Sequence, residues 1–199
     1  MTAASDPFAS VPSPVVSATC DQTNFKISDA INHTLSPGVY CGGLKLSGSG
    51  SITFQTGTYI INGTDVGGKS FDYTGSGNLS GTNVMFYITG QNGYTAGPIN
   101  LSGSGNLTFS ALSSGSYQGI LFYQDRSVSY AAANTYTGSG NVTGTFYFPS
   151  TSLTYSGSGN ALAQAIVASK VTMSGSGNFT KDTGGTLTGL VKTVAALIQ

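Results

Sequence analysis

A short phrase, glycine-serine-glycine and usually then asparagine, is written six times in this chain. Its first glycines are Gly48, Gly75, Gly103, Gly138, Gly157 and Gly175, which lie 27, 28, 35, 19 and 18 residues apart. Steps of this size are typical of repeat proteins in which each repeat is one structural unit stacked on its neighbours. We therefore predict an all-β fold, a right-handed parallel β-helix (β-solenoid) of about six coils with three short strands in each.

Five of the six phrases follow a short alternation of apolar and polar residues; before the fourth, Asn134 stands where the first apolar residue would be. Leu44 and Leu46 precede the first phrase, and Phe71 and Tyr73 precede the second. A period of two places the apolar side chains on one face of a strand. A third, more apolar run follows in most repeats: TYIIN at 58, VMFYI at 84, GILFY at 119, TFYFP at 145 and QAIVA at 164. We expect these strands to form three parallel sheets around one core.

The Gly-Ser-Gly corner has two physical uses. Glycine accepts a positive φ angle, and it lets the backbones of successive coils approach closely because it has no Cβ. The asparagine after the corner can hydrogen-bond to the coils above and below. We predict a structural asparagine ladder, with Ser51 as its first rung and then Asn78, Asn106, Asn141, Asn160 and Asn178.

Charge is scarce in this sequence. Charged residues make up 7% of the chain and the net charge is zero, whereas roughly a quarter of the residues are charged in ordinary domains. The chain has neither a basic stripe for phosphates nor a polybasic cluster for anionic lipid, so binding to nucleic acid or to a charged membrane surface is not expected. No stretch reaches the ~20 apolar residues of a membrane span. Membrane association would require an anchor upstream of this chain.

The two cysteines, Cys20 and Cys41, lie before the first repeat. We predict a disulfide between them, which would contribute about 3 kcal/mol by closing a loop of this size and would indicate an oxidising compartment. The alternative is a pair of buried free thiols. A structural zinc site is not expected, because these two thiols and the single His33 are fewer ligands than such a site uses.

The repeats divide the chain into four expected segments. Residues 1–19 are a linker or N-terminal extension, residues 20–43 a disulfide-closed N-terminal cap, residues 44–185 the β-solenoid, and residues 186–199 a C-terminal cap or docking strand.

Two groups of residues are candidates for contact with a partner. In the longest step between phrases, Asp125 and the only arginine, Arg126, follow an apolar strand; they form either a partner contact or a local ion pair. In addition, one ring of each Phe-Tyr pair must point outward. Tyr87, Tyr123 and Tyr147 would then form an exposed tyrosine stripe, for which the alternative role is ordinary stabilisation of the sheet.

No catalytic, metal-binding or cofactor-binding residue is predicted. Enzymes that cleave polysaccharides use paired carboxylates or a bound cation, whereas the seven aspartates here are dispersed and glutamate is absent. Only Asp72 and Asp125 lie near strand ends in the predicted solenoid. They are the residues that a polysaccharide-acting enzyme would use, and this is the least favoured of the hypotheses.

Four strings resemble a known family. They are SPGVYCGGLKLSGSGSITFQTGTYIING from 36, GILFYQDRS from 119, FYFPSTSLTYSGSGN from 146 and the terminal LVKTVAALIQ. From about Pro7 to Gln199 the chain is similar to the C-terminal region of TadG-like proteins, which belong to the tight-adherence (Flp/Tad) pilus-assembly loci of Gram-negative bacteria.

The resemblance implies a protein of the periplasm or cell surface, outside the inner membrane. It implies a non-enzymatic structural or adhesion module that supports pilus assembly or surface attachment, with pilus proteins, cell-surface proteins or a surface glycan as partners. The rival hypothesis is a self-assembling filament subunit, because the open ends of a solenoid carry unpaired strand edges that can associate end to end.

Overall fold

The chain forms two parallel β-sheets in a computed structural model, which describes residues 6–158, 160–163, 165–175 and 179–181. These residues contain no helix. The predicted terminal segment 186–199 lies outside the described residues. The strands are β1 (Gln22–Ile27), β2 (His33–Leu35), β3 (Gly38–Leu46), β4 (Ile52–Phe54), β5 (Gly57–Asn62), β6 (Phe71–Tyr73), β7 (Leu79–Gly81), β8 (Val84–Thr89), β9 (Ile99–Leu101), β10 (Leu107–Ser110), β11 (Ile120–Gln124), β12 (Asn134–Tyr136), β13 (Asn141–Thr143), β14 (Thr145–Tyr155), β15 (Asn160–Ala163), β16 (Ile166–Met173) and β17 (Phe179–Lys181).

The larger sheet closes on itself. Eight of its strands pair in the order β3, β5, β8, β11, β14, β12, β9 and β6, and β6 pairs again with β3. We call these eight strands the ring. Every pair in the ring is parallel, and β1 and β16 are attached outside it, to β3 and β14.

The closure depends on the two longest strands of the ring, each of which pairs with two different partners. Residues 38–41 of β3 pair with β5, whereas residues 44–46 pair with β6. Gly42 and Gly43 lie between these halves with φ angles of 76° and 82°, a conformation that favours glycine. In β14, residues 145–147 pair with β11 and residues 153–155 with β12.

This closed connectivity, which is that of a parallel barrel, corrects the predicted fold. The all-β class is as expected, but the β-solenoid (β-helix) with three separate sheets is wrong. The alternation of apolar residues located the short strands, yet it carried no information on how β3 and β14 continue through a bend. Because these two strands pair on both sides of the bend, strands expected in two sheets are joined into one ring.

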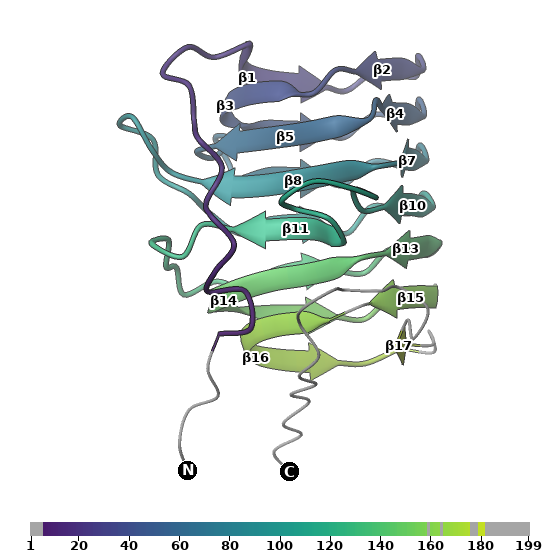
Figure 1. The fold of residues 1–199 in the computed structure, drawn as a ribbon. Helices are drawn as coiled ribbons and strands as arrows, with labels where there is room; N and C mark the ends of the chain where they lie inside the picture. Colours follow the sequence, from purple (N-terminus) through teal and green to yellow (C-terminus); the bar gives the residue numbers. More distant parts are fainter. Residues whose placement is uncertain (1–5, 159, 164, 176–178, 182–199) are drawn as a thin grey trace.

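The second sheet completes the enclosure of the core. It consists of β2, β4, β7, β10, β13, β15 and β17, and we call it the flank sheet. Its strands lie side by side along one flank of the molecule (Figure 1). Phe54 of the flank sheet meets Phe86 of the ring with ring centroids 5.1 Å apart, and Phe86 stacks on Phe122 at 5.2 Å. All three side chains are buried in one core.

The Gly-Ser-Gly corners are explained mainly by close backbone approach. Among the described glycines of the phrase, only Gly140 and Gly175 have a positive φ angle. At the others, an added Cβ would overlap a neighbouring residue: at Gly77 it would overlap the carbonyl oxygen of Gly50, and at Gly105 that of Gly77. The second and third corners therefore stack glycine on glycine, and a larger residue would force them apart.

Candidate functional site

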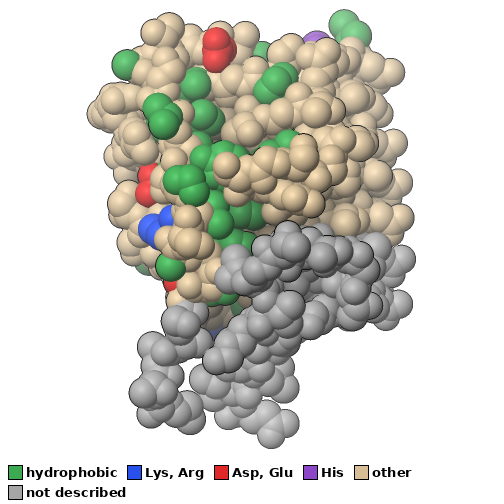
Figure 2. Space-filling model, in the orientation of Figure 1, with side chains coloured by type: hydrophobic (Ala, Val, Ile, Leu, Met, Phe, Trp, Pro, Cys, Tyr) green, Lys and Arg blue, Asp and Glu red, His purple; other side chains and the backbone are tan. Residues whose placement is uncertain are grey.

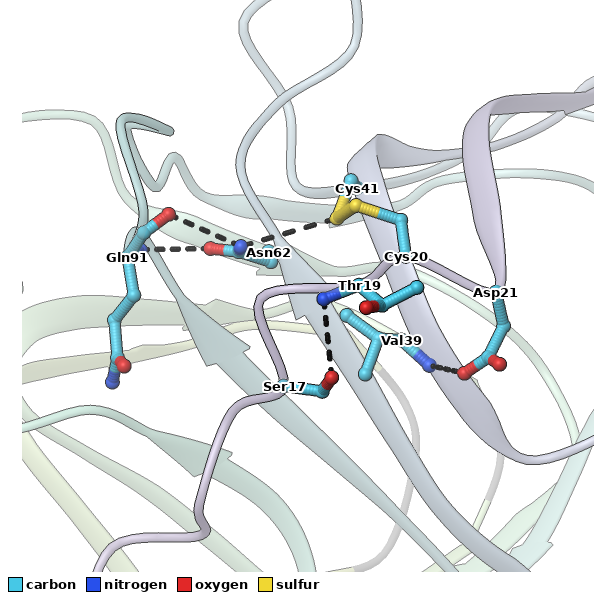
Figure 3. Close-up of a disulfide and its surroundings, with 8 residues drawn as sticks. All are labelled: Ser17, Thr19, Cys20, Asp21, Val39, Cys41, Asn62 and Gln91. Carbon is cyan, nitrogen blue, oxygen red and sulfur yellow. Dashed lines mark hydrogen bonds between the residues drawn. A yellow bond between two sulfur atoms is a disulfide. The ribbon is translucent and has the colours of Figure 1, made fainter.

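Cys20 and Cys41 form the predicted disulfide, with their Cα atoms 5.8 Å apart, so neither is a free thiol. Cys41 is buried in β3, and Asn62 beside it is held by Gln91, whose backbone N–H donates to Asn62 Oδ1 at 2.7 Å (Figure 3). The disulfide is compatible with an extracytoplasmic protein. None of the described residues belongs to a helix with the length and apolar character of a membrane span.

Residues 6–16, which we call the strap, cross the outside of the ring. In Figure 1 the strap runs in purple past β5, β8 and β11 to β14. Phe8 is 4% exposed and packs in a second apolar cluster that includes Met85 of β8 and Ile120 of β11. Part of the segment predicted as a linker is therefore packed against the fold.

Arg126 holds the strap through three different residues. Its Nε donates a hydrogen bond to Asp6 Oδ2 at 3.1 Å, and this contact is also an ion pair. Its two terminal nitrogens donate to backbone carbonyl oxygens, Nη1 to Val11 at 3.0 Å and Nη2 to Phe8. A guanidinium has a planar fork of donors that suits such an arrangement, so one side chain binds the strap at three points between Asp6 and Val11.

Two tyrosines complete the Arg126 site. The guanidinium lies over their rings, with Cζ 5.5 Å from the centroid of Tyr123 and 5.2 Å from that of Tyr147. Tyr147 also donates its hydroxyl hydrogen to Asp6 Oδ2 at 2.6 Å. Burial raises the pKa of the Asp6 carboxyl, but hydrogen bonds from Tyr147, the Phe8 backbone and Arg126 outweigh it and lower that pKa overall.

The predicted tyrosine stripe exists, but the expected exposure is wrong. Tyr87, Tyr123 and Tyr147 lie opposite one another on neighbouring strands, with ring centroids 5.4 and 5.1 Å apart. All three are 0% exposed. The strap covers them together with Leu112 and Tyr117 of the loop after β10. The sequence signal for the strap is the apolar pair Phe8 and Val11 in a segment otherwise typical of a linker.

Asp125 and Arg126 do not form the predicted local ion pair, because their side chains have different partners. Arg126 pairs with the strap, whereas Asp125 Oδ2 accepts hydrogen bonds from Tyr87 Oη at 2.9 Å, Thr89 Oγ1 at 2.8 Å and Gln91 Nε2 at 3.2 Å. The Asp125 carboxylate therefore ties the end of β11 to β8 and to the loop that follows β8.

The Asp125 carboxylate is held in its ionised form. Burial alone would raise its pKa, but hydrogen bonds from the Ser127 backbone and hydroxyl and from Thr89 and Tyr87 lower the pKa to about 2. Burial and this neighbouring carboxylate raise the pKa of Tyr87, so the tyrosine remains a donor. The Asp125 carboxylate and the Tyr87 hydroxyl bind each other and neighbouring protein groups, which indicates a structural role.

Asp72, the other candidate of the enzyme hypothesis, lies elsewhere on the ring. Its Oδ2 accepts a hydrogen bond from Lys45 Nζ at 2.9 Å, and its Oδ1 accepts one from Asn100 Nδ2 at 2.8 Å. Lys45 also contacts Asp65 at 3.2 Å. Asp72 is on β6 and Asp125 follows β11, strands that are not neighbours in the ring. The two carboxylates share no partner among the contacts of the described residues.

The asparagine ladder begins earlier than predicted. Asn32 Oδ1 accepts a hydrogen bond from the Ser51 backbone at 2.9 Å, which makes Asn32 a rung before the first phrase. Asn78 Oδ1 accepts one from the Asn106 backbone at 3.0 Å. Each bond joins the corner before one flank-sheet strand to the corner before the next.

The ladder changes register in its later part. Ser139 lies opposite Asn106 and donates its hydroxyl hydrogen to Asn106 Oδ1 at 3.0 Å. Asn141 is therefore displaced from the column, and it lies opposite Asn160 instead. Asn178 lies outside the described residues. Gly140 lies at this change of register with a φ angle of 115°, and no other described glycine in this position of the phrase has a positive φ angle.

The outer face of the flank sheet carries a regular column of hydroxyl side chains from β2 to β10. Thr34, Thr53, Ser80 and Thr108 lie opposite one another on successive strands, and the hydroxyl oxygens of Thr53 and Ser80 are 3.4 Å apart. Neighbouring strands are about 4.8 Å apart, so this column repeats a hydroxyl at that interval beside the corner amides. On the part of the flank-sheet side that Figure 2 shows in colour, no acidic or basic side chain is visible.

Comparison of the chain with protein-family models, curated proteins and solved structures gave no match. Two surfaces of the protein are therefore candidates for function. One is the strap site around Arg126, which is occupied by the chain itself, and the other is the exposed hydroxyl column on the outer face of the flank sheet.

Proposed function

We propose that this protein is a non-enzymatic, extracytoplasmic adhesion module that binds a neutral surface glycan through the outer face of the flank sheet. The observation that carries the proposal is the open column of Thr34, Thr53, Ser80 and Thr108 beside the corner amides. Hydroxyl and amide groups both donate and accept hydrogen bonds, as sugar hydroxyls do. A regular column permits many weak bonds to a polymer that is itself repetitive.

The absence of charge from this part of the sequence favours a neutral ligand. No acidic or basic residue occurs between Asp72 and Asp125, a stretch that contains β7 and β10. An acidic polysaccharide or a nucleic acid would therefore gain no Coulomb attraction from these strands. A neutral polysaccharide needs none, because its affinity comes from hydrogen bonds and shape.

A glycan fits this face better than a protein does. Protein interfaces are typically centred on apolar and aromatic side chains. Among the residues that the structure describes, the exposed large hydrophobic side chains are Val15, Ile31, Val66, Val171 and Met173. None of these lies on β4, β7, β10 or β13, which form the middle of the flank sheet.

The cellular setting belongs to the same proposal. Support comes from the disulfide, which is typical of proteins outside the cytoplasm, and from the resemblance to TadG-like proteins of Gram-negative bacteria. In that setting the module would attach a pilus or the cell envelope to a surface in the periplasm or outside the cell.

The test is a sedimentation assay with insoluble polysaccharides. The full chain is mixed with neutral cellulose, chitin or starch and, separately, with an acidic polymer such as alginate. The variant Thr53→Lys/Thr108→Lys places two charges on the flank face, and the matched control Thr135→Lys/Thr154→Lys places them on the outward column of β12 and β14. We expect binding to a neutral polymer, weakened about tenfold or more by the flank variant, which corresponds to about 1.4 kcal/mol. Equal loss in both variants, or binding to alginate alone, would contradict the proposal.

A filament subunit is the second candidate, favoured by the strand edges at one end of the molecule. Among the described pairings, β1 pairs only with β3 and β2 only with β4. A hollow of ≈ 420 Å³ lies at this end, lined in part by Phe25, Leu35 and Tyr40. Exposed strand edges are templates for association with another chain. Light scattering over a range of concentrations tests this candidate, and a strictly monomeric species would exclude it.

A further inference from the structure

We propose that the strap site is an exchange site, at which the strap of one copy binds the ring of a second copy. The first reason is how the strap is attached. Residues 6–16 belong to no strand, and they are held by side-chain packing and by the donors of Arg126. The strap can therefore leave the ring without breaking the pairing of either sheet.

The second reason is that the contacts are concentrated at the far end of the strap. Asp6, Phe8 and Val11 make the contacts with Arg126. Most of residues 12–19 are exposed, apart from the buried Pro14 and the half-buried Val16. Cys20 is then fixed to β3 by the disulfide. An extended chain spans about 3.3 Å per residue, so the eight connecting residues reach up to about 25 Å and can carry the contact residues to a neighbouring molecule.

The third reason is that a ring without a bound strap would be energetically unfavourable. Without the strap, the apolar cluster that contains Tyr87, Tyr123 and Tyr147 would lose the packing of Phe8, Val11 and Val16. Contiguous exposed apolar patches of this kind promote association. Arg126 would also lose its carboxylate and both carbonyl acceptors. The identical strap of a second copy restores every one of these contacts, as in domain swapping.

The balance between the two arrangements depends on concentration. A segment joined to its own site by a short linker has an effective concentration in the millimolar range. In dilute solution each strap therefore occupies its own ring and the protein is a monomer. Where copies are crowded on a surface, exchange links them, either as mutual pairs or as a head-to-tail chain. This inference is independent of the glycan proposal, because it uses a different face of the molecule.

The test uses two full-length variants that complement each other. Asp6→Asn/Phe8→Ala has a defective strap and an intact ring, whereas Arg126→Gln has an intact strap and a defective ring. One variant carries an affinity tag, and the pair is mixed at high concentration before capture on a column. We expect the untagged partner to be recovered from this mixture. The control is a chain that carries all three substitutions, so that both its strap and its ring are defective. Mixed with either of the two variants, this chain should not be recovered.

A second measurement protects the test against a variant that fails to fold. A labelled peptide of residues 1–16 is added to the Asp6→Asn/Phe8→Ala chain, and fluorescence anisotropy is recorded. The peptide should reach half-saturation below about 1 mM, because the strap in its own molecule has an effective concentration in the millimolar range. A peptide carrying the same two substitutions should bind at least about tenfold more weakly. No peptide binding, or equal binding of both peptides, overturns the proposal, as does failed capture from a mixture of two folded variants.

Discussion

Arg126 donates a hydrogen bond to the carboxylate of Asp6 at 3.1 Å, and the two residues are 120 positions apart in the sequence. The contact connects the strap to the end of β11. Because the strap has no strand hydrogen bonds of its own, this ion pair and the neighbouring tyrosines determine whether it is docked.

Substitution of Arg126 by glutamine should release the strap. The change removes the ion pair with Asp6 and the donors to two backbone carbonyls. Since hydrogen bonds to charged groups contribute about 1.5–3 kcal/mol each in favourable cases and these side chains are only half-buried, we expect a loss of about 2 kcal/mol in the free energy of unfolding. Urea denaturation measures it. The matched control, Lys26→Gln on the exposed face of β1, should change stability by less than about 0.5 kcal/mol.

Stability should fall in acid through Asp125. The pKa of this carboxyl is about 2 in the fold, below its ordinary value of 3.8. Because the folded pKa is the lower one, the ionised group stabilises the fold above pH ~4, and this contribution is lost as the pH falls toward ~2. We expect Asp125→Asn to be less stable than the wild type by about 1 to 2 kcal/mol near neutral pH. The difference in the free energy of unfolding between the two proteins should become smaller below pH ~4. A difference that does not change with pH would contradict this explanation.

A Cβ at Gly77 should be poorly tolerated. Gly77→Ala places a methyl group against the carbonyl oxygen of Gly50, which is backbone and cannot move aside as a side chain can. We expect a loss of at least about 2 kcal/mol, since overpacking typically costs 1–3 kcal/mol. The control is Gly67→Ala, an exposed loop position where the nearest atom is a side-chain oxygen of Asp65 at 3.2 Å. The midpoint temperature of thermal unfolding should be clearly lower for Gly77→Ala than for Gly67→Ala. Similar midpoints would show that the backbone at the corners can shift to accommodate a methyl group.

Removal of the disulfide should destabilise the fold without rearranging it. Cys20→Ser/Cys41→Ser opens a loop with a sequence separation of 21 residues, and we expect a loss of about 3 kcal/mol. Treatment of the wild type with a reductant should produce the same change in the denaturation midpoint. If reduction has no effect while the double variant is unstable, the cost comes from burying serine at position 41 rather than from the lost cross-link.

Local patterns predicted the strands well, because the alternation that marks a strand involves only neighbouring residues. The alternation around Leu44 and Leu46 and around Phe71 and Tyr73 lies in β3 and β6, with all four side chains buried. The stacking of the corners was also predictable, since only glycine lets two backbones approach so closely. The closure of the ring was not, because it depends on which partner each half of a long strand meets after its bend.

The candidate site was harder to predict than the fold. Arg126 was singled out as the only arginine, but its partner, Asp6, lies in a segment whose prolines and small residues are typical of a linker. No pattern within a few residues of Arg126 points to a contact at such separation. The tyrosine stripe was predicted correctly in its alignment and wrongly in its exposure, for the same reason: what covers a strand face comes from elsewhere in the chain.

Sequence patterns were enough to predict the all-β class, the short strands and the glycine corners, because alternation and steric limits act over a few residues. They also favoured the disulfide, since two cysteines have one possible partner each. The closing of the larger sheet through β3 and β14, the change of register in the asparagine ladder near Gly140 and the packing of the strap over the tyrosines became visible only in the folded chain. These outcomes are set by register and docking between distant segments. Their free energies depend on the assembled surfaces rather than on any local pattern.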